Sequence, residues 1–329
     1  MTRRKLDLAV EPLAFRSPLR IAGRIFEGIP GIRVAISHHG LVGRGEAGGV
    51  FYLGDDPHHM TAQIDSVRAA VEGGAGRAEL QSLLPCGGAR NALDAALWEL
   101  EARIRGLPVW HLAGTPKPHP CVTTYTLGAD NISLLDANLA AYADARALKL
   151  KLDGDIEADI ARIRRVHALR PDAWLMVDAN QGYSLATLGQ LAPVLVEARV
   201  RLVEQPLARG EDAALEGLDF PIPIAADESV QGLDELAGLS GRYQVANIKL
   251  DKCGGLTEAL LMVAEARRLG LGVMVGNMGG SSLAAAPAYL LAQLCDRVDL
   301  DGPKFLAEDL MGGAVYSDGC IAVASKFWG

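Results

Sequence analysis

Eight short apolar segments recur along the second part of the chain, and most of them end at a charged residue. Their ends lie about 25 residues apart, which is the length of one strand plus one helix. They follow the prolines at positions 116, 118 and 120, and they comprise residues 122–127, 148–151, 174–178, 200–204, 222–227, 245–249, 272–276 and 297–301. Such alternation predicts either a doubly wound sheet or a (β/α)8 barrel, and the count and even spacing favour the barrel.

The segments between these predicted strands have a helical pattern. Apolar residues recur at three- and four-residue steps, which is typical of a helix with one buried face. The two clearest stripes are Ile156, Ile160, Ile163, Val166 and Leu169, and Leu256, Leu260, Val263 and Ala264. No clear eighth helix follows Asp301, because the chain runs through Gly302 and Pro303 into a glycine-rich tail.

The first 120 residues predict a separate α+β domain. Strands are expected at 5–13, 32–37 and 50–53, and helices at 59–73 and 90–105, the second ending at Gly106. We therefore expect a capping domain at residues 1–120, a barrel at 121–304, and a segment at 305–329 that returns to the cap. The run from Gly43 to Gly48 matches a dinucleotide-binding pattern, but no helical period follows it, so the context for a phosphate site is missing.

Composition excludes several classes of protein. No apolar run approaches the roughly 20 residues that a membrane span needs, and Met1 to Lys5 is not followed by an apolar signal-peptide core, so we expect a cytoplasmic location. The formal charge of −8 argues against nucleic-acid binding. The five cysteines are scattered without a C-x-x-C, which indicates free thiols. The sequence leaves a homo-oligomer possible.

The segment Leu148 to Asp153 contains the motif Lys-x-Lys. Leucines alternate with Lys149 and Lys151, so a strand places the leucines on one face and both lysines on the other. By itself this pattern also fits an edge strand whose solvated lysines prevent aggregation. The residues at the ends of the other strands decide between these two interpretations.

Charged residues end five successive predicted strands and recur at the eighth. In a barrel the carboxyl ends of all strands meet at one rim, so we expect these side chains to lie close together. Three carboxylates, flanked by lysines on the strands before and after, suit Mg²⁺ better than zinc, because the set holds no histidine or cysteine. In chain order the set is Lys149, Lys151, Asp178, Glu204, Asp227, Lys249, Asp299 and Asp301.

Several of these segments together resemble the enolase superfamily, in particular its muconate-lactonizing subgroup and, within it, the dipeptide epimerases of the L-Ala-D/L-Glu type. The resemblance covers nearly the whole chain. It rests on Leu148-Lys-Leu-Lys-Leu-Asp, Val177-Asp-Ala-Asn, Val203-Glu-Gln-Pro-Leu, Ala226-Asp-Glu-Ser, Asn247-Ile-Lys-Leu-Asp-Lys-Cys-Gly-Gly-Leu, and Gly87-Gly-Ala-Arg-Asn-Ala-Leu-Asp in the first domain.

The resemblance implies a role for each residue of the set. Asp178, Glu204 and Asp227 would hold Mg²⁺. Lys151 and Lys249 would remove and return the α-proton of a dipeptide's C-terminal residue through an enediolate. Lys252 is the rival of Lys249, which we prefer because it ends the strand. The remaining roles are Lys149 as an electrostatic support that favours the neutral amine of Lys151, and Asp299 with Asp301 as the partners of the substrate's ammonium group.

Substrate selection is expected to come from two segments of the cap, residues 20–31 and 45–55, which cover the barrel mouth in this family. Arg24 has two interpretations, a partner for a substrate side-chain carboxylate or a solvated residue. Other reactions of the subgroup, o-succinylbenzoate synthase or muconate cycloisomerase, are alternatives, but Asp299 and Asp301 would repel their anionic substrates. A barrel that only binds small acids is the remaining alternative.

Overall fold

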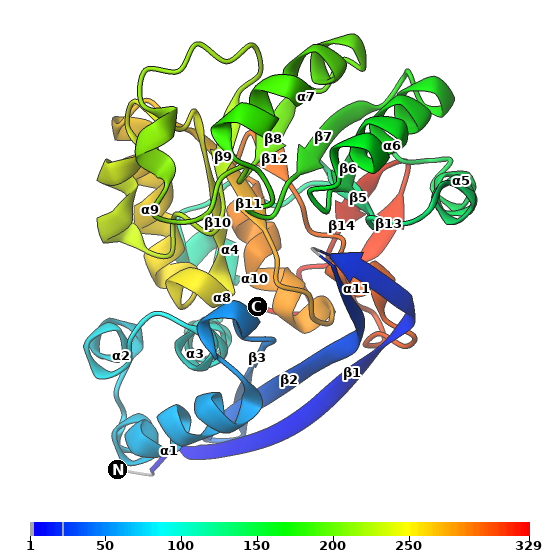
Figure 1. Ribbon diagram of the computed structural model, residues 1–329. Coiled ribbons are helices and arrows are strands. Elements are labelled where there is room, and N and C mark those ends of the chain that lie inside the picture. The colour runs from blue at the N-terminus through cyan, green and yellow to red at the C-terminus, as the bar shows by residue number, and fades with distance from the viewer. Residues whose placement is uncertain (1–2, 22) are drawn as a thin grey trace.

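The N-terminal part of the chain forms a long antiparallel sheet packed against helices (Figure 1). This computed structural model describes residues 3–21 and 23–329. The strands pair in the order β1-β2-β3. Their bounds are β1 Lys5–Ile21, β2 Arg24–His38 and β3 Leu41–Ala47, and the helices are α1 Pro57–Gly73, α2 Arg77–Leu83, α3 Gly88–Arg105 and α4 Val109–Leu112.

The third strand of this sheet differs from the prediction. Residues Val50 to Leu53 were expected to be a strand, but Phe51–Leu53 is a 3₁₀ turn, η1, and the strand is β3. A Cβ atom at Gly43 would lie 1.9 Å from the carbonyl oxygen of Ala96 in α3. Because glycine allows this close approach, a run that looks like a phosphate loop is a strand pressed onto a helix.

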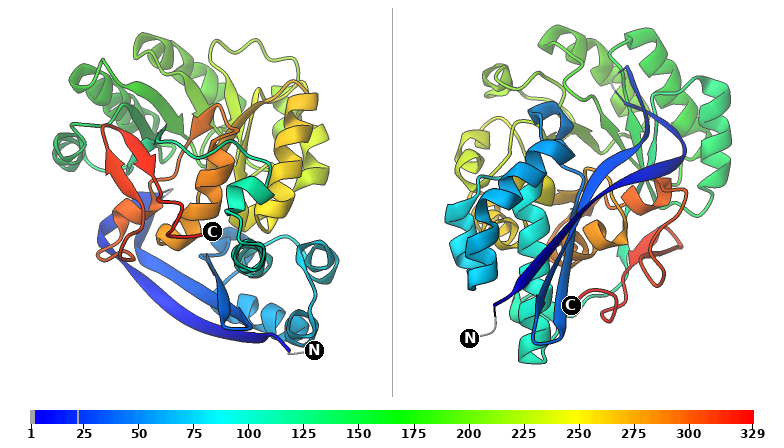
Figure 2. Two further views of the ribbon diagram at one scale, coloured as in Figure 1. Left: turned by 180° about the vertical axis from the view of Figure 1, so that it is seen from behind. Right: turned by 90° about the horizontal axis from the view of Figure 1, so that it is seen from below.

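The predicted segment 20–31 is also more regular than expected. Apart from residue 22, which lies outside the described residues, most of it is the far end of the β1–β2 hairpin. The hairpin curves from the foot of the cap to the barrel (Figures 1 and 2). There Phe15 bridges to Leu306, and the Ala129 amide donates to the carbonyl of Arg20 at 3.1 Å.

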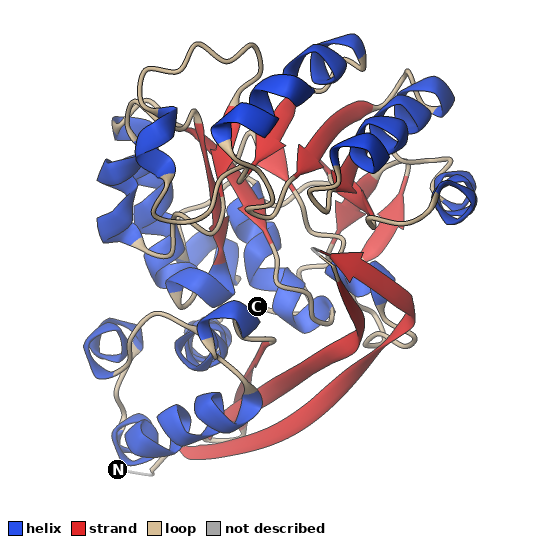
Figure 3. Cartoon of the chain, in the orientation of Figure 1, coloured by secondary structure: helices blue, strands red, loops and turns tan. Residues whose placement is uncertain are grey.

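Eight parallel strands form the nearly closed barrel, with helices around them (Figure 3). Each strand pairs with its neighbours in sequence order from β5 to β12. The strands are β5 Thr124–Leu127, β6 Ala147–Lys151, β7 Trp174–Asp178, β8 Leu202–Glu204, β9 Ile224–Ala226, β10 Val245–Lys249, β11 Gly272–Gly276 and β12 Arg297–Val298. The barrel prediction is therefore confirmed.

The helices of the barrel follow the predicted stripes, except that Leu169 and Ala264 are exposed and do not belong to the buried face. They are α5 Ile132–Ala141, α6 Ile156–Leu169, α7 Leu185–Glu197, α8 Leu250–Cys253, α9 Leu256–Arg268, α10 Ser282–Ala292 and α11 Gly302–Phe305, with 3₁₀ segments η2 Asp212–Leu215 and η3 Leu233–Leu239. Only the four-residue α11 follows β12, as the sequence indicated. Leu148 and Leu150 belong to the large apolar core, which also contains Ile163 of α6 and Leu256 of α9. The alternating lysines of β6 therefore face the barrel interior.

The end of the chain contacts both parts of the molecule. Strands β13 Val315–Ser317 and β14 Cys320–Ala322 form a small sheet in which β14 pairs with β4, Cys121–Val122. The first predicted barrel strand, 122–127, is therefore divided between β4 and β5. Beyond it, the indole nitrogen of Trp328 donates to the carbonyl of Arg44 in the cap at 3.1 Å.

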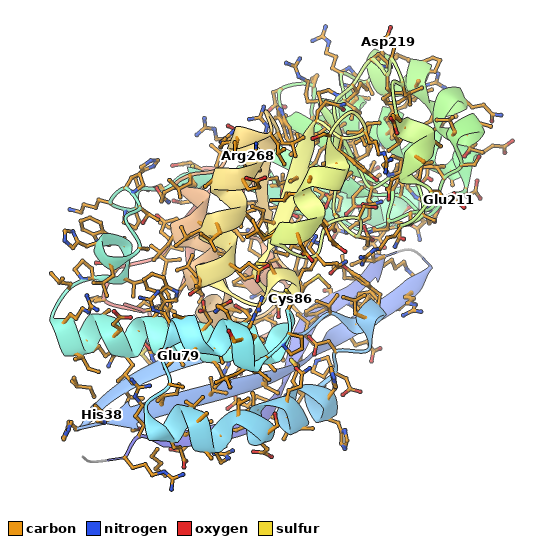
Figure 4. The ribbon with its side chains drawn as sticks, turned by 90° about the vertical axis from the view of Figure 1, so that its left-hand side faces the viewer. His38, Glu79, Cys86, Glu211, Asp219 and Arg268 are labelled. Atoms are coloured by element: carbon orange, nitrogen blue, oxygen red, sulfur yellow. The ribbon has the colours of Figure 1, made fainter. Side chains whose placement is uncertain are left out.

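The cap and the barrel are joined by polar side chains from α3. Arg90 is buried and donates to the carbonyl of Cys253 and to Glu258, and the nearby Cys86 marks this junction in Figure 4. Asp94 accepts a hydrogen bond from the Thr257 amide at 3.0 Å, at the start of α9. Within residues 3–21 and 23–329, no helix is both long and apolar enough to cross a membrane.

Candidate active site

The register of the barrel strands brings the predicted charged residues to one level. Lys151 pairs across the sheet with Asp178, and Asp178 pairs with Glu204. Asp227 follows the end of β9, and Lys249 is the last residue of β10. Since parallel strands present their carboxyl ends at one rim, five residues distant in sequence meet there.

Asp178, Glu204 and Asp227 form a carboxylate cluster that fits a divalent cation. One oxygen from each lies within 4.8 Å of the others, and at most 2% of any of the three residues is exposed. Burial followed by the charge of Asp178 raises the pKa of Glu204 to about 8. Buried carboxylates are stable when positive charge compensates them, and an all-oxygen donor set suits Mg²⁺.

Lys149 lies among these carboxylates. Its ammonium nitrogen is 2.7 Å from Glu204, 3.0 Å from Asp178 and 2.9 Å from Asp299. Burial alone would lower the pKa of Lys149, but these charges raise it well above its ordinary value. Its position is that of a fixed countercharge to the cluster, and its predicted influence on Lys151 stays a prediction.

Lys151 and Lys249 lie on opposite sides of the barrel. Lys151 Nζ donates to Asp178 at 2.6 Å, and Lys249 Nζ donates to Asp227 at 2.6 Å. In the strand order, β7, β8 and β9 separate β6 from β10 on one arc, and β11, β12 and β5 lie on the other. The two amines therefore face each other across the mouth, with the carboxylate cluster on the arc between them.

Lys252 lies behind the site. Its ammonium group is buried and donates to Asp227 and, at 3.1 Å, to the carbonyl of Asn247. Lys249 lines the cavity at the barrel mouth, and the lining does not include Lys252. Geometry thus favours Lys249 as the amine that reaches a ligand.

The second acidic pair lies on the arc opposite the carboxylate cluster. Asp299 accepts from Lys149 and from the Thr124 hydroxyl, whereas Asp301 accepts from the Thr126 amide at 2.6 Å. Burial and then the charge of Asp299 raise the pKa of Asp301 to about 7. Because Asp299 already accepts from Lys149 and from the Thr124 hydroxyl, Asp301 is the better partner for a ligand's ammonium group.

A cavity of about 290 Å³ lies between the cap and the barrel mouth. Lys151, Lys249, Asp227, Asp299 and Asp301 line its barrel side. The cap contributes a largely apolar roof, which includes Phe15, Leu19, Phe26, Ile29, Phe51 and Tyr52. The site can therefore enclose a small molecule that carries charges at both ends and apolar groups on the cap side.

Arg24 lies at the edge of this roof. Its guanidinium carbon is 5.6 Å from the centre of the Phe51 ring, within the range of a cation–π contact. Among the ion pairs between residues 3–21 and 23–329, none involves Arg24. The side chain is exposed, and Arg24 is not among the residues that line the cavity, so the structure does not bring it together with the lysines and carboxylates of the site.

Several residues of the site were not predicted. Asn247 donates to Glu204 at 2.7 Å, and it could have been found because it lies two residues before Lys249 on the same strand face. The Thr124 and Thr126 contacts follow the same alternation on β5. Tyr52 reaches the site from the cap, and nothing in the local sequence pattern indicates this.

Comparisons with known proteins agree with this geometry. Residues 135–326 match the family model described as enolase C-terminal domain-like, and residues 5–114 match the mandelate racemase / muconate lactonizing enzyme, N-terminal domain. The L-Ala-D/L-Glu epimerase of Escherichia coli K12 is 39% identical over 288 residues, which are 87% of this chain and 89% of that protein.

Solved structures are similar over almost the full length. An enolase family member from Agrobacterium tumefaciens with homology to dipeptide epimerases, with bound sodium and L-Ala-L-Glu, is 39% identical with a TM-score of 0.94, covering 99% of this chain and 100% of that one. A dipeptide epimerase from Methylococcus capsulatus, complexed with Mg and L-Arg-D-Lys, is 32% identical with a TM-score of 0.91, covering 98% of each chain.

Proposed function

Because the chain belongs to the mandelate racemase / muconate lactonizing enzyme family of the enolase superfamily, we propose that it is a magnesium-dependent dipeptide epimerase. This isomerase inverts the α-carbon of the dipeptide's C-terminal residue. The observation that carries the proposal is the pair Lys151 and Lys249, which face each other across one cavity beside a carboxylate cluster. Inversion needs one amine to take the α-proton and an ammonium group on the opposite side to deliver another.

In this mechanism Asp178, Glu204 and Asp227 would hold Mg²⁺. When bound, the cation offsets the negative charge that develops on the substrate carboxylate as the α-proton leaves. Lys151 and Lys249 exchange roles as base and acid, depending on which isomer binds. The buried position of both amines keeps bulk water from protonating the enediolate. One lysine takes the α-proton, and the opposite lysine delivers a different proton. Because lysine N–H protons exchange with solvent between turnovers, deuterium enters the α-carbon in D₂O.

The substrate's other end sets its orientation. The substrate's C-terminal carboxylate points toward the carboxylate cluster and its cation. Its N-terminal ammonium group then extends to the opposite arc, where it donates a hydrogen bond to Asp301, and the charge of Asp299 adds to the local negative potential. This arrangement disfavours o-succinylbenzoate synthase and muconate cycloisomerase chemistry, because those substrates lack an ammonium group. The ammonium group of Lys149 reduces the repulsion between Asp299 and the proposed metal ligands Asp178 and Glu204, because it lies within 3.0 Å of all three carboxylates.

For the dipeptide itself, we propose L-Ala-D/L-Glu as the leading candidate, with Arg24 as the partner of the glutamate side chain. The support is the exposed guanidinium beside the cavity roof, together with the relatives that act on or bind this dipeptide. An arginine forms bidentate hydrogen bonds to a carboxylate, which gives such recognition its geometry.

The direct test is incubation with Mg²⁺ and a dipeptide library in D₂O. We expect deuterium at the α-carbon of the second residue and interconversion of its two isomers, measured by NMR and chiral chromatography. Turnover of an o-succinylbenzoate precursor, with no exchange in any dipeptide, would overturn the assignment.

A cytoplasmic location is proposed as well. It is supported by the five cysteines, all of which are free, since reducing compartments keep thiols unpaired. The homo-oligomer also stays a proposal, and light scattering after size-exclusion chromatography tests it.

A further inference from the structure

Residues 48–56 form a loop, here called the cap loop, that runs from β3 to α1 above the cavity. Phe51, Tyr52 and Asp55 of this loop line the cavity. The Phe51 ring lies 5.3 Å from that of Tyr52 and 5.3 Å from that of Phe26 in the hairpin, both edge to face. The cap loop therefore carries the aromatic surface on which Arg24 rests.

One end of the cap loop is fastened to the barrel by a single buried carboxylate. Asp251 Oδ1 accepts hydrogen bonds from the amides of Gly48 at 3.1 Å and Gly49 at 3.0 Å. Asp251 is only 5% exposed and lies two residues after Lys249, within α8. Gly49 has a φ of +71°, and a Cβ there would lie 2.1 Å from the Asp55 carbonyl oxygen, so only glycine fits this turn.

The other end of the cap loop is fastened to the cap. Asp55 Oδ2 accepts a hydrogen bond from the Gly88 amide at 2.7 Å, at the start of α3. His59 Nδ1 lies 3.3 Å from the second oxygen of Asp55. Two carboxylates therefore define where the apex of the loop lies, one from the barrel and one from the cap itself.

Between these anchors, Tyr52 reaches the Lys249 side of the site. Its hydroxyl oxygen is buried and makes no hydrogen bond of standard geometry within the part of the chain that the structure describes. The nearby Gln231 side chain partly offsets the rise in the pKa of this hydroxyl, and the Gln231 side-chain oxygen also has no partner of standard geometry. Tyr52 lines the cavity together with Lys249, Asp227 and Glu228. Buried hydroxyl groups normally have a partner. Because Tyr52 lines the cavity and Gln231 does not, the hydroxyl can turn from Gln231 to a ligand in the cavity.

We infer that Asp251 is a positioning residue, which holds the cap loop so that Tyr52 closes the Lys249 side of the cavity and binds the substrate there. The inference rests on the proposed epimerase function. The Lys249 side then depends on the cap loop more than the Lys151 side does, because Asp251 lies in α8 two residues after Lys249, whereas Lys151 lies on β6. Loosening the loop should therefore disturb proton transfer at Lys249 more than at Lys151.

Three variants test this role. Asp251→Ala leaves the amides of Gly48 and Gly49 without an acceptor, whereas Asp251→Asn keeps an oxygen that can accept from both. Asp94→Ala is the matched control, because Asp94 is another buried aspartate that links cap and barrel and does not contact the cap loop. Each protein is assayed with Mg²⁺ in D₂O for α-proton exchange of both dipeptide isomers. The isomer that still exchanges in Lys151→Ala identifies the Lys249 face.

We expect Asp251→Ala to slow exchange at the Lys249 face by about tenfold, the scale of lost hydrogen bonds to buried groups, and to change the Lys151 face less than about threefold. Asp251→Asn should restore the ratio of the two rates, and Asp94→Ala should leave that ratio unchanged. Backbone amide exchange across residues 48–56, measured by mass spectrometry, should rise in Asp251→Ala alone.

Equal slowing of both isomers in Asp251→Ala would overturn the inference and assign Asp251 an ordinary structural role. If that variant does not fold, Tyr52→Phe takes its place, since it removes only the hydroxyl, and equal losses on both faces would overturn the inference likewise. A wild-type protein that exchanges no dipeptide contradicts the epimerase proposal instead, and the amide-exchange comparison then still decides whether Asp251 clamps the loop.

Discussion

The Lys151 and Lys249 sides of the site each hold a lysine paired with a carboxylate, but they are built from different parts of the molecule. Each lysine donates to one carboxylate of the cluster at 2.6 Å. Lys151 has Lys149 two residues before it on the same face of β6. Lys249 has Met278 Sδ at 3.9 Å and shares its wall of the cavity with Tyr52 from the cap loop.

The Lys249 side also differs in that an ionisable group of the cap, the Tyr52 hydroxyl, lies near its amine. Burial raises the pKa of the Tyr52 hydroxyl above its ordinary value, the charge of Asp227 adds to this, and the charge of Lys249 opposes it. Tyr52 is thus a neutral donor near the Lys249 amine. The barrel thus supplies two similarly placed lysines, whereas the cap makes their surroundings unequal.

Removal of the metal should affect both sides equally and most strongly. We expect chelation with EDTA to abolish α-proton exchange of both isomers, a loss of at least about 10³-fold. Without the cation, nothing offsets the negative charge that develops on the substrate carboxylate when the α-proton leaves. Exchange is measured by NMR in D₂O before and after addition of Mg²⁺. Residual exchange of one isomer alone would show that the metal serves one face only, and Ca²⁺ or Zn²⁺ in place of Mg²⁺ controls for simple charge restoration.

Removal of one lysine should separate the two sides. Lys151→Ala and Lys249→Ala are each expected to lower epimerisation by about 10³-fold, within the range for a lost acid or base. Each variant should retain exchange of the isomer whose proton faces the remaining lysine. Lys252→Ala is the comparison for Lys249, and full epimerisation in Lys249→Ala with loss in Lys252→Ala would reverse their roles.

Asp301→Asn tests the proposed ammonium-binding position, which lies on the arc opposite the carboxylate cluster and should serve both isomers equally. We expect kcat/KM for dipeptides to fall by about 10- to 100-fold for both isomers, since a hydrogen bond to a charged group is lost. N-acetylated dipeptides, which lack the ammonium group, should lose much less. A larger loss on one face would mean that Asp301 acts on one lysine and not on the substrate.

The pH dependence depends on the same residue. With a pKa of about 7, Asp301 is neutral below this pH and cannot pair with an ammonium group. The KM for dipeptides should therefore rise as the pH falls below about 7, and Asp301→Asn should flatten this rise.

Arg24→Ala should have the smallest and most selective effect. For L-Ala-L-Glu we expect the KM to rise up to about tenfold, as for an exposed charge pair with good geometry. The kinetic constants for L-Ala-L-Ala should stay the same, and Arg24→Lys should recover part of the loss. Equal effects on both dipeptides would make Arg24 part of the roof only.

The barrel half of the site could be predicted because each of its residues belongs to a strand that can be recognised from the pattern of that segment alone. Lys151, Asp178, Glu204, Asp227 and Lys249 each end a strand, and the structure brings all five to one rim as expected. Strand alternation shows which side chains face inward, and parallel order shows which ends meet. The roles of these residues, and of Lys149, remain proposals until the variants are measured.

The cap half could not be predicted in the same way. Gly43 and Gly45 lowered the strand signal of β3, because glycine is depleted in strands, and only packing against α3 explains them. The contact between Gly49 and Asp251 spans 202 residues. No pattern within one segment indicates such a pair.

The sequence by itself thus determined the alternation of strands and helices, the inward face of each strand, and the set of charged residues at the rim. These properties depend on periods of two residues in strands and 3.6 residues in helices, and the order of side chains within a single segment shows both periods. Tertiary structure alone decided that Lys249 and not Lys252 reaches the cavity, that Lys149 neutralises Asp299, and that Asp251 holds the cap loop beside Lys249. Such contacts depend on how separate elements pack, and packing is a property of the whole chain.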